Sequence, residues 1–360
     1  MATYPLKVLR RRQESEDAVS LWLDVPNDLR TAFTYRTGQF IAIEEEFDGE
    51  EITRQYSLAS VPGLDEHLHI SVKRIPGGRM STHLVDSVAD GDLLEVVTPR
   101  GRLYTPSQEP RHILLLAAGS GIVPLLAIAR DALHSGAGHR VTLVYGNRHT
   151  DSVMLREEVE ALAADGAVVE HVLSRPDPSW TGARGRVDPA YLESRWAQWT
   201  AECGLPVSAY LCGPEAFMSD AEEFLTAHGV GIDDIRKESF DLVLDDDGDE
   251  ADLLVPGDAP AAEPEPCTLL TAVLGGENIE VTPEPGEPLL SALLRVSDDV
   301  PFSCQEGTCS SCIVKLTEGQ VGVRPGVTKT LRPADLEEGL ILACLSRART
   351  ESVHIDFDDI

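Results

Sequence analysis

The stretch Cys304-Gln-Glu-Gly-Thr-Cys309-Ser-Ser-Cys312 decides the fold of the last part of the chain. Its three cysteines have the spacing C-x4-C-x2-C, and a fourth, Cys344, follows downstream. Four thiolates with this spacing are typical of a [2Fe–2S] cluster. Zinc is the alternative, but structural zinc sites usually pair two short knuckles, whereas here three ligands share one loop. The spacing therefore predicts a [2Fe–2S] centre held by Cys304, Cys309, Cys312 and Cys344.

A [2Fe–2S] centre carries one electron and makes no bond to a substrate, so another part of the chain must supply that electron. The length of 360 residues suggests two or three domains. A net charge of −31 argues against binding to nucleic acid or to an anionic membrane surface. The N-terminal residues contain no apolar signal segment, and four of the seven cysteines are assigned to the cluster. We therefore expect a cytoplasmic protein.

Four patterns follow one another along the chain. Short alternating strands with recurrent turn signals predict an antiparallel β-barrel in residues 1–106. Strands that alternate with helices predict a parallel, doubly wound α/β domain in residues 107–242. Residues 243–266 read as an acidic, proline-rich linker, and residues 267–360 form the cluster domain.

Two segments allow a second interpretation. Residues 241–266 contain ten Asp and Glu and no Lys or Arg, so they could also be an acidic docking patch instead of a mobile tether. The run His112–Ala129 is apolar enough to imitate a membrane span. Its glycines and Pro124 instead predict a buried strand, a tight turn and a helix.

Three short motifs have a chemical interpretation. Arg54-Gln-Tyr56-Ser57 places a cation for a phosphate and an aromatic ring for a flat ligand on one strand face. Gly77-Gly78-Arg79-Met80-Ser81-Thr82 opens a helix whose N-terminal amides could bind a pyrophosphate, although an ordinary helix cap has the same residues. Ala117-Ala118-Gly119-Ser120-Gly121-Ile122-Val123-Pro124 lies where an open α/β sheet binds a nucleotide, but lacks the third glycine of the common dinucleotide fingerprint.

These motifs occur in a fixed order, followed by Cys212-Gly213-Pro214 and then the cluster cysteines. In this order the sequence resembles the ferredoxin–NADP reductase superfamily. More narrowly, it is similar to reductase components of bacterial oxygenases with a C-terminal ferredoxin domain, such as the phenylacetyl-CoA oxygenase and 3-ketosteroid 9α-hydroxylase reductases. The resemblance covers the chain except the acidic linker, and implies a β-grasp fold for the ferredoxin domain.

The resemblance also implies roles for particular residues. The resemblance assigns flavin binding to a strand segment and to the start of a helix, with Tyr56 stacked on the flavin ring and Ser57 near flavin N5. The residues are Arg54, Tyr56, Ser57, Leu58, Gly78, Arg79, Met80, Ser81 and Thr82. The nicotinamide nucleotide falls to Gly119, Gly121, Ile122 and Pro124, and to Cys212, Gly213 and Pro214, where a polarisable sulfur approaches the nicotinamide. Ser57, Cys212 and Glu238 are the predicted catalytic residues, and Phe240 is expected to pack by the flavin.

The type of flavin and the type of nicotinamide nucleotide depend on residues around these motifs. The surroundings of the motifs favour FAD, with FMN as the alternative. Four arginines and a serine near the ends of the second and third parallel strands suit the 2′-phosphate of NADPH, although NADH stays open and solvent-facing arginines are the alternative. These residues are Arg148, Ser174, Arg175, Arg184 and Arg186.

We therefore expect an electron-transfer reductase. NAD(P)H reduces the flavin, and electrons pass singly through the cluster to a separate terminal oxygenase or similar acceptor. A stand-alone NAD(P)H oxidase or quinone reductase is one alternative, and a non-catalytic redox-sensing adaptor is another.

Overall fold

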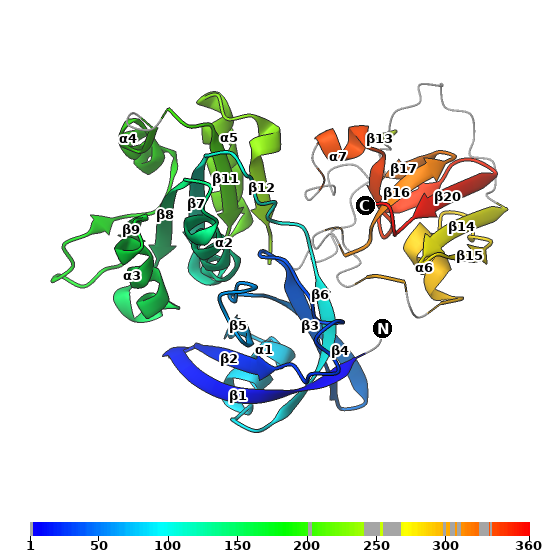
Figure 1. Ribbon diagram of the computed structural model, residues 1–360, viewed down its shortest axis with the longest axis horizontal. Coiled ribbons are helices and arrows are strands. Elements are labelled where there is room, and N and C mark those ends of the chain that lie inside the picture. Colours follow the sequence, from blue (N-terminus) through cyan, green and yellow to red (C-terminus); the bar gives the residue numbers. More distant parts are fainter. Residues whose placement is uncertain are drawn as a thin grey trace. The chain divides into compact units, whose positions relative to one another are not determined.

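The computed structural model describes residues 3–200, 204–240, 253–254, 268–297, 300–302, 307, 311–323, 331 and 333–360. The chain divides between residues 241 and 242 into two compact units. The first unit contains an antiparallel barrel and a parallel α/β sheet, and the second contains the cluster domain (Figure 1). The domain boundaries given above remain predictions, and the predicted linker lies largely outside the described residues.

The barrel is a six-stranded sheet with the order β4-β3-β6-β1-β2-β5. An isolated antiparallel bridge joins Leu58, the residue after β4, to Ile70 of β5, and so connects the two outer strands of the sheet. Alternate apolar residues fill the interior, because successive strand residues point to opposite faces. Its elements are β1 (Tyr4–Ser15), β2 (Ala18–Asp24), β3 (Phe40–Phe47), β4 (Glu50–Ser57), β5 (Leu68–Lys73), α1 (Arg79–Asp86) and β6 (Leu93–Arg100).

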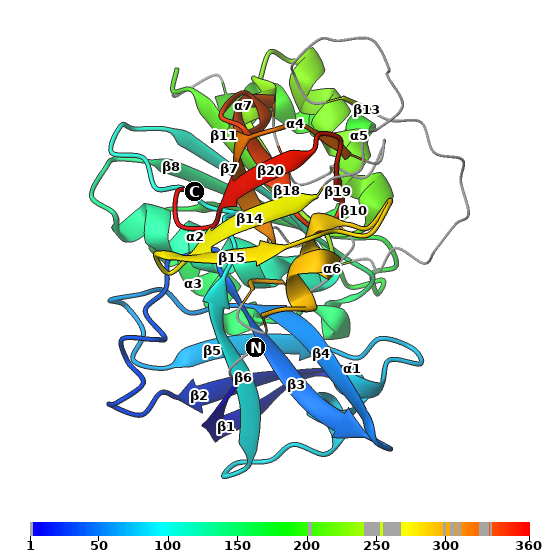
Figure 2. The same ribbon diagram turned by 90° about the vertical axis from the view of Figure 1, so that its right-hand side faces the viewer.

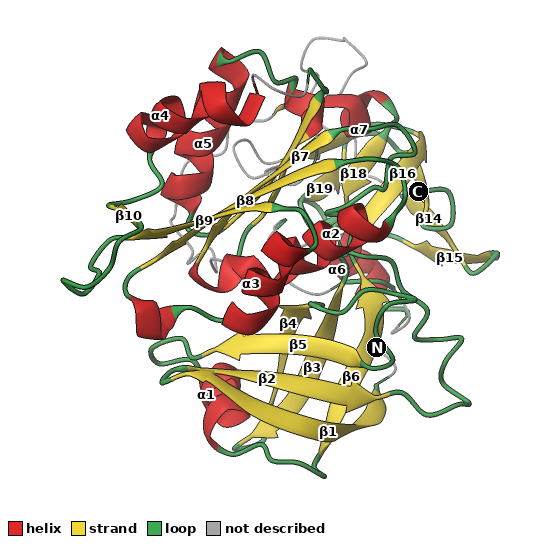
Figure 3. Ribbon diagram, turned by 60° about the vertical axis from the view of Figure 1, so that its left-hand side comes forward, coloured by secondary structure: helices red, strands yellow, loops and turns green. Residues whose placement is uncertain are grey.

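The second sheet of this unit is entirely parallel, with the order β10-β9-β8-β7-β11-β12. Helices α2 and α3 cover one face and α4 and α5 the other (Figure 3). Its strands are β7 (His112–Ala118), β8 (Arg140–Asn147), β9 (Val168–Leu173), β10 (Ala183–Arg184), β11 (Val207–Cys212) and β12 (Ile235–Glu238). Its helices are η1 (Gly119–Gly121), α2 (Ile122–His134), η2 (Thr150–Ser152), α3 (Arg156–Ala164), α4 (Pro189–Thr200), α5 (Glu215–Ala227) and η3 (Ile232–Asp234).

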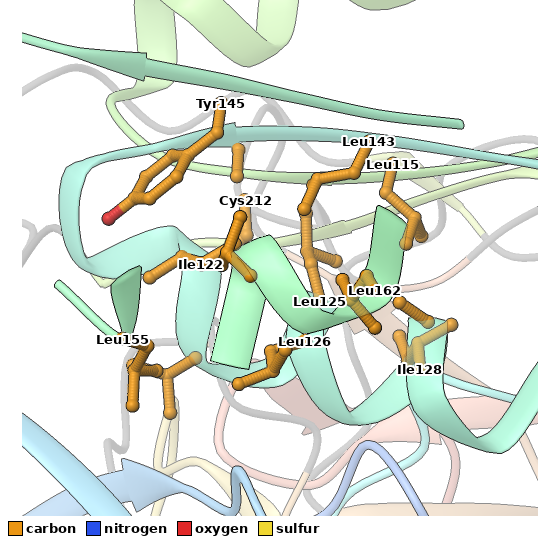
Figure 4. Close-up of a cluster of buried hydrophobic side chains, with 14 of the residues drawn as sticks. Leu115, Ile122, Leu125, Leu126, Ile128, Leu143, Tyr145, Leu155, Leu162 and Cys212 are labelled. Atoms are coloured by element: carbon orange, nitrogen blue, oxygen red, sulfur yellow. The ribbon is translucent and has the colours of Figure 1, made fainter. Parts of the chain in front are cut away.

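The apolar run at His112–Ala129 thus forms strand β7, a glycine turn and the start of α2, as predicted. It is buried because β7 is a central strand and α2 packs on its face (Figure 4). In the part of the chain that the structure describes, no helix is long and apolar enough to cross a membrane. Helix α4 and the edge strands β10 and β12 were not predicted.

The barrel and the parallel sheet share one hydrophobic cluster and are joined by polar contacts. Ala18 and Ala59 of the barrel belong to the core that α2 and α3 form with the sheet. Arg130 on α2 makes two hydrogen bonds to Asp65 of the barrel, at 2.7 and 2.9 Å. Thr37 donates to Asp131 at 3.0 Å. These contacts lie between the barrel and helix α2 of the parallel sheet.

The second unit contains a mixed five-stranded sheet, β15-β14-β20-β16-β18, with α6 packed on it (Figure 2), and a three-stranded sheet, β13-β17-β19. Strands β14 and β20 are parallel, and the other described pairs are antiparallel. The elements are β13 (Leu253–Leu254), β14 (Leu269–Leu274), β15 (Glu277–Val281), α6 (Leu289–Leu294), β16 (Ile313–Glu318), β17 (Val321–Val323), α7 (Pro333–Glu337), β18 (Leu340–Leu342), β19 (Ser346–Ala348) and β20 (Ser352–Asp356).

Candidate flavin, nucleotide and cluster sites

The order of the parallel sheet locates the nucleotide site. Chain order runs outward from β7 to β8 and β9 on one side, and from β7 to β11 and β12 on the other, so the order reverses between β7 and β11. Ligands of open α/β sheets bind at such a switch point, outside the carboxyl ends of the strands. The segments that follow β7 and β11 are the predicted nucleotide segments, Gly119–Pro124 and Cys212–Pro214.

The two segments are in close contact. A Cβ atom on Gly121 would lie 2.0 Å from the carbonyl oxygen of Cys212, so only glycine fits there. Gly119 has φ +57° and opens toward free space, a conformation that glycine adopts at little cost. Ile122 and Pro124 are buried in the first turn of α2. The glycines are therefore needed for the backbone conformation of the turn, whereas the side chains of Ile122 and Pro124 are buried in the core beneath it.

Three predicted catalytic residues meet at this edge. Ser57, at the end of barrel strand β4, donates from Oγ to Oε2 of Glu238 at 2.7 Å. Glu238 ends β12 and pairs in register with Cys212 on β11. The contact joins residues 181 positions apart and brings the barrel to the switch point.

The environment of Glu238 and Cys212 disfavours their charged forms. Burial raises the pKa of Glu238 to about 7, and the hydrogen bond from Ser57 opposes this shift in part. Burial raises the pKa of the Cys212 thiol well above its ordinary value, and the nearby Glu238 carboxyl adds to the effect. Cys212 is therefore a neutral thiol, suited to packing against a ligand ring rather than to nucleophilic attack.

The predicted flavin residues occupy the end of β4 and the start of α1. Tyr56 is partly buried and packs against the barrel core, whereas Arg54 is exposed and donates to the carbonyl of Thr53 at 2.8 Å. Leu58 and Met80 are buried in the barrel. Gln55, which no motif singled out, has a buried amide nitrogen without a hydrogen-bond partner. Such a donor fits a polar ring ligand, because buried donors are normally paired.

The hydroxyl groups of Ser81 and Thr82, at the start of α1, already have hydrogen-bond partners in the neighbouring backbone. Thr82 donates from its hydroxyl to the Gly78 carbonyl at 2.6 Å, and the Ser81 hydroxyl accepts from the amide of Ile75 at 3.1 Å. Arg79 turns to the β3–β4 hairpin, where it pairs with Glu50 at 2.6 Å and Asp48 at 3.1 Å. The backbone amides at the start of α1 are thus the groups most suited to a flavin phosphate.

A cavity of about 420 Å³ lies at the carboxyl ends of β8 and β9, lined by Arg148, Ser174, Arg175, Gly185 and Arg186. Among the described residues, no side-chain partner is seen for the guanidinium groups of these three arginines. Arg184 differs, because it donates at 2.6 Å to the carbonyl of Trp180 and also to the carbonyls of Asp177 and Pro178. The cavity therefore presents three cations without a described side-chain partner, which fits a phosphate-bearing nucleotide.

The second unit brings two of the four predicted cluster ligands together. Cys312 precedes β16 and Cys344 follows β18, and these strands pair with Ile313 opposite Leu342. Their sulfur atoms are 3.1 Å apart, and both are buried free thiols. Two thiolates this close can bind one metal ion. Cys304 and Cys309 lie outside the described residues.

Comparison with known proteins agrees with this arrangement. A model described as the oxidoreductase FAD-binding domain matches residues 5–104, and the oxidoreductase NAD-binding domain matches residues 115–223. The 2Fe-2S iron-sulfur cluster binding domain matches residues 273–349. The fold and the sites thus define a flavin- and NAD-binding oxidoreductase with an iron–sulfur domain, and FAD is the flavin of the matched model.

Relatives that match over nearly their full length identify the class of oxidoreductase more closely. The chain is 34% identical to the ferredoxin reductase component of 3-ketosteroid-9-alpha-monooxygenase from Rhodococcus rhodochrous, over 96% of this chain and 94% of that protein. It is 31% identical to a component of the 1,2-phenylacetyl-CoA epoxidase from Escherichia coli K12, over 99% and 98%. The solved structure of phthalate dioxygenase reductase has the same fold, with a TM-score of 0.57 and 22% identity over 99% of this chain and 98% of that one. The chain belongs to the ferredoxin–NADP reductase superfamily, among the oxygenase reductase components with a C-terminal [2Fe–2S] domain, which confirms the predicted family.

Proposed function

We propose that this protein is the reductase component of an oxygenase system, and that it passes electrons from NAD(P)H through FAD and the [2Fe–2S] cluster to a separate terminal oxygenase. The observation that carries the proposal is the meeting of Ser57, Cys212 and Glu238 at the switch point of the sheet. The full-length similarity to components of monooxygenase and epoxidase systems supports it. A cytoplasmic location fits, since a reducing compartment keeps cysteines available as cluster ligands.

FAD bound at the end of β4 would accept a hydride from the nicotinamide and release the electrons singly. The residues of the chain orient and insulate that exchange. Tyr56, which packs against the barrel core, would present its ring to the flavin, and Cys212 offers a small neutral sulfur on the nucleotide side. Glu238 can hold a proton at its carboxyl near neutral pH, and the Ser57 hydroxyl in contact with Oε2 can exchange it with a ligand.

The cavity at β8 and β9 supports NADPH rather than NADH as the preferred donor. Its three guanidinium groups without a described side-chain partner suit the 2′-phosphate, which NADH lacks. A chain with 61 Asp and Glu could readily have paired these arginines, yet no described carboxylate does so. The ratio of kcat/KM for NADPH to that for NADH measures this preference.

Replacing one cluster ligand tests the electron path. Cys344→Ala should remove the cluster absorbance and abolish NAD(P)H-dependent reduction of cytochrome c, because the one-electron route is lost. Reduction of ferricyanide, which accepts electrons from the flavin directly, should persist and would show that residues 3–240 remain folded.

Cys267→Ala provides the matched control, because Cys267 is a cysteine that no motif assigns to the cluster. It should change neither activity. If Cys344→Ala reduced cytochrome c as fast as the unaltered protein, the proposed path would be wrong, and a stand-alone NAD(P)H oxidase or quinone reductase would be the better description.

A further inference from the structure

A series of hydrogen bonds runs from the nucleotide turn toward the barrel, through residues that belong to no motif. Tyr145, on β8, is fully buried (Figure 4). Its hydroxyl donates to the carbonyl of Gly119 at 3.0 Å and accepts from the amide of Met154 at 3.3 Å. A buried tyrosine hydroxyl needs one partner, but this one joins two separate segments. It ties the turn after β7 to the segment that precedes α3.

The next bond crosses to the barrel. The amide of Leu155 donates to Oε2 of Glu14, on barrel strand β1, at 2.9 Å. Leu155 is fully buried and has φ +53°, a left-handed conformation that a leucine adopts only when its surroundings hold it there. The backbone at Leu155 is therefore fixed by Glu14 from one side and by its own packing from the other.

Glu14 is itself held in place. Its side chain is only 5% exposed, and Arg12 donates from Nε to its Oε1 at 2.7 Å, with Nη2 2.6 Å from the same oxygen. The same Nη2 atom lies 2.6 Å from Oε1 of Glu158, in the first turn of α3. Arg12 thus links the Glu14 carboxylate and α3 in one partly buried ion network, in which Coulomb attraction is stronger than on the open surface.

We propose that Tyr145 and Glu14 are positioning residues for the reaction: they fix the Gly119–Gly121 turn relative to the barrel, and thereby the nicotinamide nucleotide relative to the flavin. The inference rests on the proposed function, because it takes this turn to bind the nucleotide. Gly121 already abuts the Cys212 carbonyl, so the Tyr145 bond to Gly119 restrains the other end of the turn. Small displacements of a bound reactant cost rate, which gives such restraint a function.

Tyr145→Phe removes the hydroxyl and leaves the ring in the core. We expect KM for the nucleotide to rise roughly two- to tenfold, the effect of one lost hydrogen bond, with FAD content unchanged. Thr37→Val is the matched control, since it removes another hydrogen bond between barrel and α2, to Asp131, that does not lead to the turn. It should leave KM unchanged. An unaltered KM in Tyr145→Phe, with or without a lower Tm, overturns the proposal.

A double-mutant cycle tests whether Glu14 acts through the same path. Glu14→Ala should raise KM, and Glu14→Gln, which keeps an oxygen acceptor for Leu155, should restore part of the loss. Combined with Tyr145→Phe, Glu14→Ala should raise KM by less than the product of the two separate effects, because both changes release one turn. Independent, multiplicative effects overturn the proposal.

The outcomes also separate this inference from the proposed function. All variants are assayed by NAD(P)H-dependent ferricyanide reduction, which needs no cluster. If the unaltered protein shows no such activity, the proposed function fails. If it is active and Tyr145→Phe has the same KM, only the positioning role fails.

Discussion

The two sites proposed to bind phosphate groups, at the start of α1 and on the nucleotide side, are built in opposite ways. On the flavin side, the hydroxyl of Thr82 bonds to Gly78 and the guanidinium of Arg79 pairs with Asp48 and Glu50. On the nucleotide side, the cations of the cavity have no side-chain partner among the described residues, and Gly121 packs directly against a strand backbone. The start of α1 pairs its own polar side chains, whereas the cavity beside β8 and β9 leaves its cations to a ligand.

This difference predicts where substitutions are costly. A turn whose side chains are already paired offers a ligand mainly its backbone amides, and side-chain changes there act chiefly on stability. A site with unpaired cations takes its affinity from those side chains, so changes there act on ligand choice. A glycine packed against backbone tolerates nothing larger.

The largest effect is expected at Gly121. Gly121→Ala places a methyl group 2.0 Å from the Cys212 carbonyl oxygen, and backbone cannot move aside as a flexible side chain would. We expect a loss of about 3 kcal/mol or more in the free energy of unfolding, at the upper end for overpacking, and loss of nucleotide-dependent ferricyanide reduction. Urea denaturation and steady-state assays measure both.

Gly119→Ala is the control for this prediction. A Cβ there meets nothing within 4 Å, so only the cost of φ +57° remains, about 1 kcal/mol. If Gly119→Ala were as damaging as Gly121→Ala, close packing against β11 would not be what distinguishes this turn.

The cavity arginines come next. Arg175→Ala combined with Arg186→Ala should lower kcat/KM for NADPH by roughly a hundredfold, because two charge-assisted contacts to phosphate are lost, while kcat/KM for NADH changes little. Arg184→Ala, which alters the loop carbonyl contacts but not the cavity, should leave the NADPH/NADH ratio unchanged. Equal losses with both nucleotides would mean that these arginines do not select the 2′-phosphate.

The different contacts of Arg184 and Arg186 could not be predicted from the sequence, whereas some local structure could. Both are exposed arginines two residues apart, and only the loop conformation directs one to carbonyls and the other to the cavity. The strand, turn and helix at residues 112–134 were predictable, because an apolar run with glycine punctuation is a local signal.

Long-range contacts left no such signal. Ser57 and Glu238 were each predicted from the family resemblance, but their hydrogen bond depends on how the barrel packs on the sheet. Glu14 and Tyr145 have no motif at all, since a glutamate on a strand and a tyrosine in a core are ordinary residues. Their connection through Met154 and Leu155 exists only in the folded chain.

Glu238 joins the barrel to the parallel sheet through Ser57, and its effect should depend on pH. Burial raises its pKa to about 7, above the unfolded value, so its contribution to stability is fully present below the unfolded value and is lost as pH rises through about 7. The anion formed above that pH adds an uncompensated negative charge where an anionic nucleotide binds. We expect kcat/KM for the nucleotide to fall roughly fivefold between about pH 7 and pH 8, with an apparent pKa near 7.

Glu238→Gln should remove this dependence, because the amide does not titrate and can still accept the hydrogen bond from Ser57. The pH profile of ferricyanide reduction measures it. A transition of the same size in Glu238→Gln would assign the titration to another group.

The smallest effect is expected on the flavin side, at Arg79. Its ion pairs with Asp48 and Glu50 are largely exposed, and such pairs contribute about 0–1 kcal/mol. Arg79→Ala should therefore lower the free energy of unfolding by no more than about 1 kcal/mol and weaken FAD retention only a few-fold, with the loss diminishing at high salt. Arg30→Ala, at an exposed arginine for which no described side-chain partner is seen, should change neither. A loss of FAD on the scale predicted for NADPH at the cavity would mean that Arg79 leaves its carboxylate partners to bind the flavin phosphate. The flavin site and the cavity would then use their arginines in the same way.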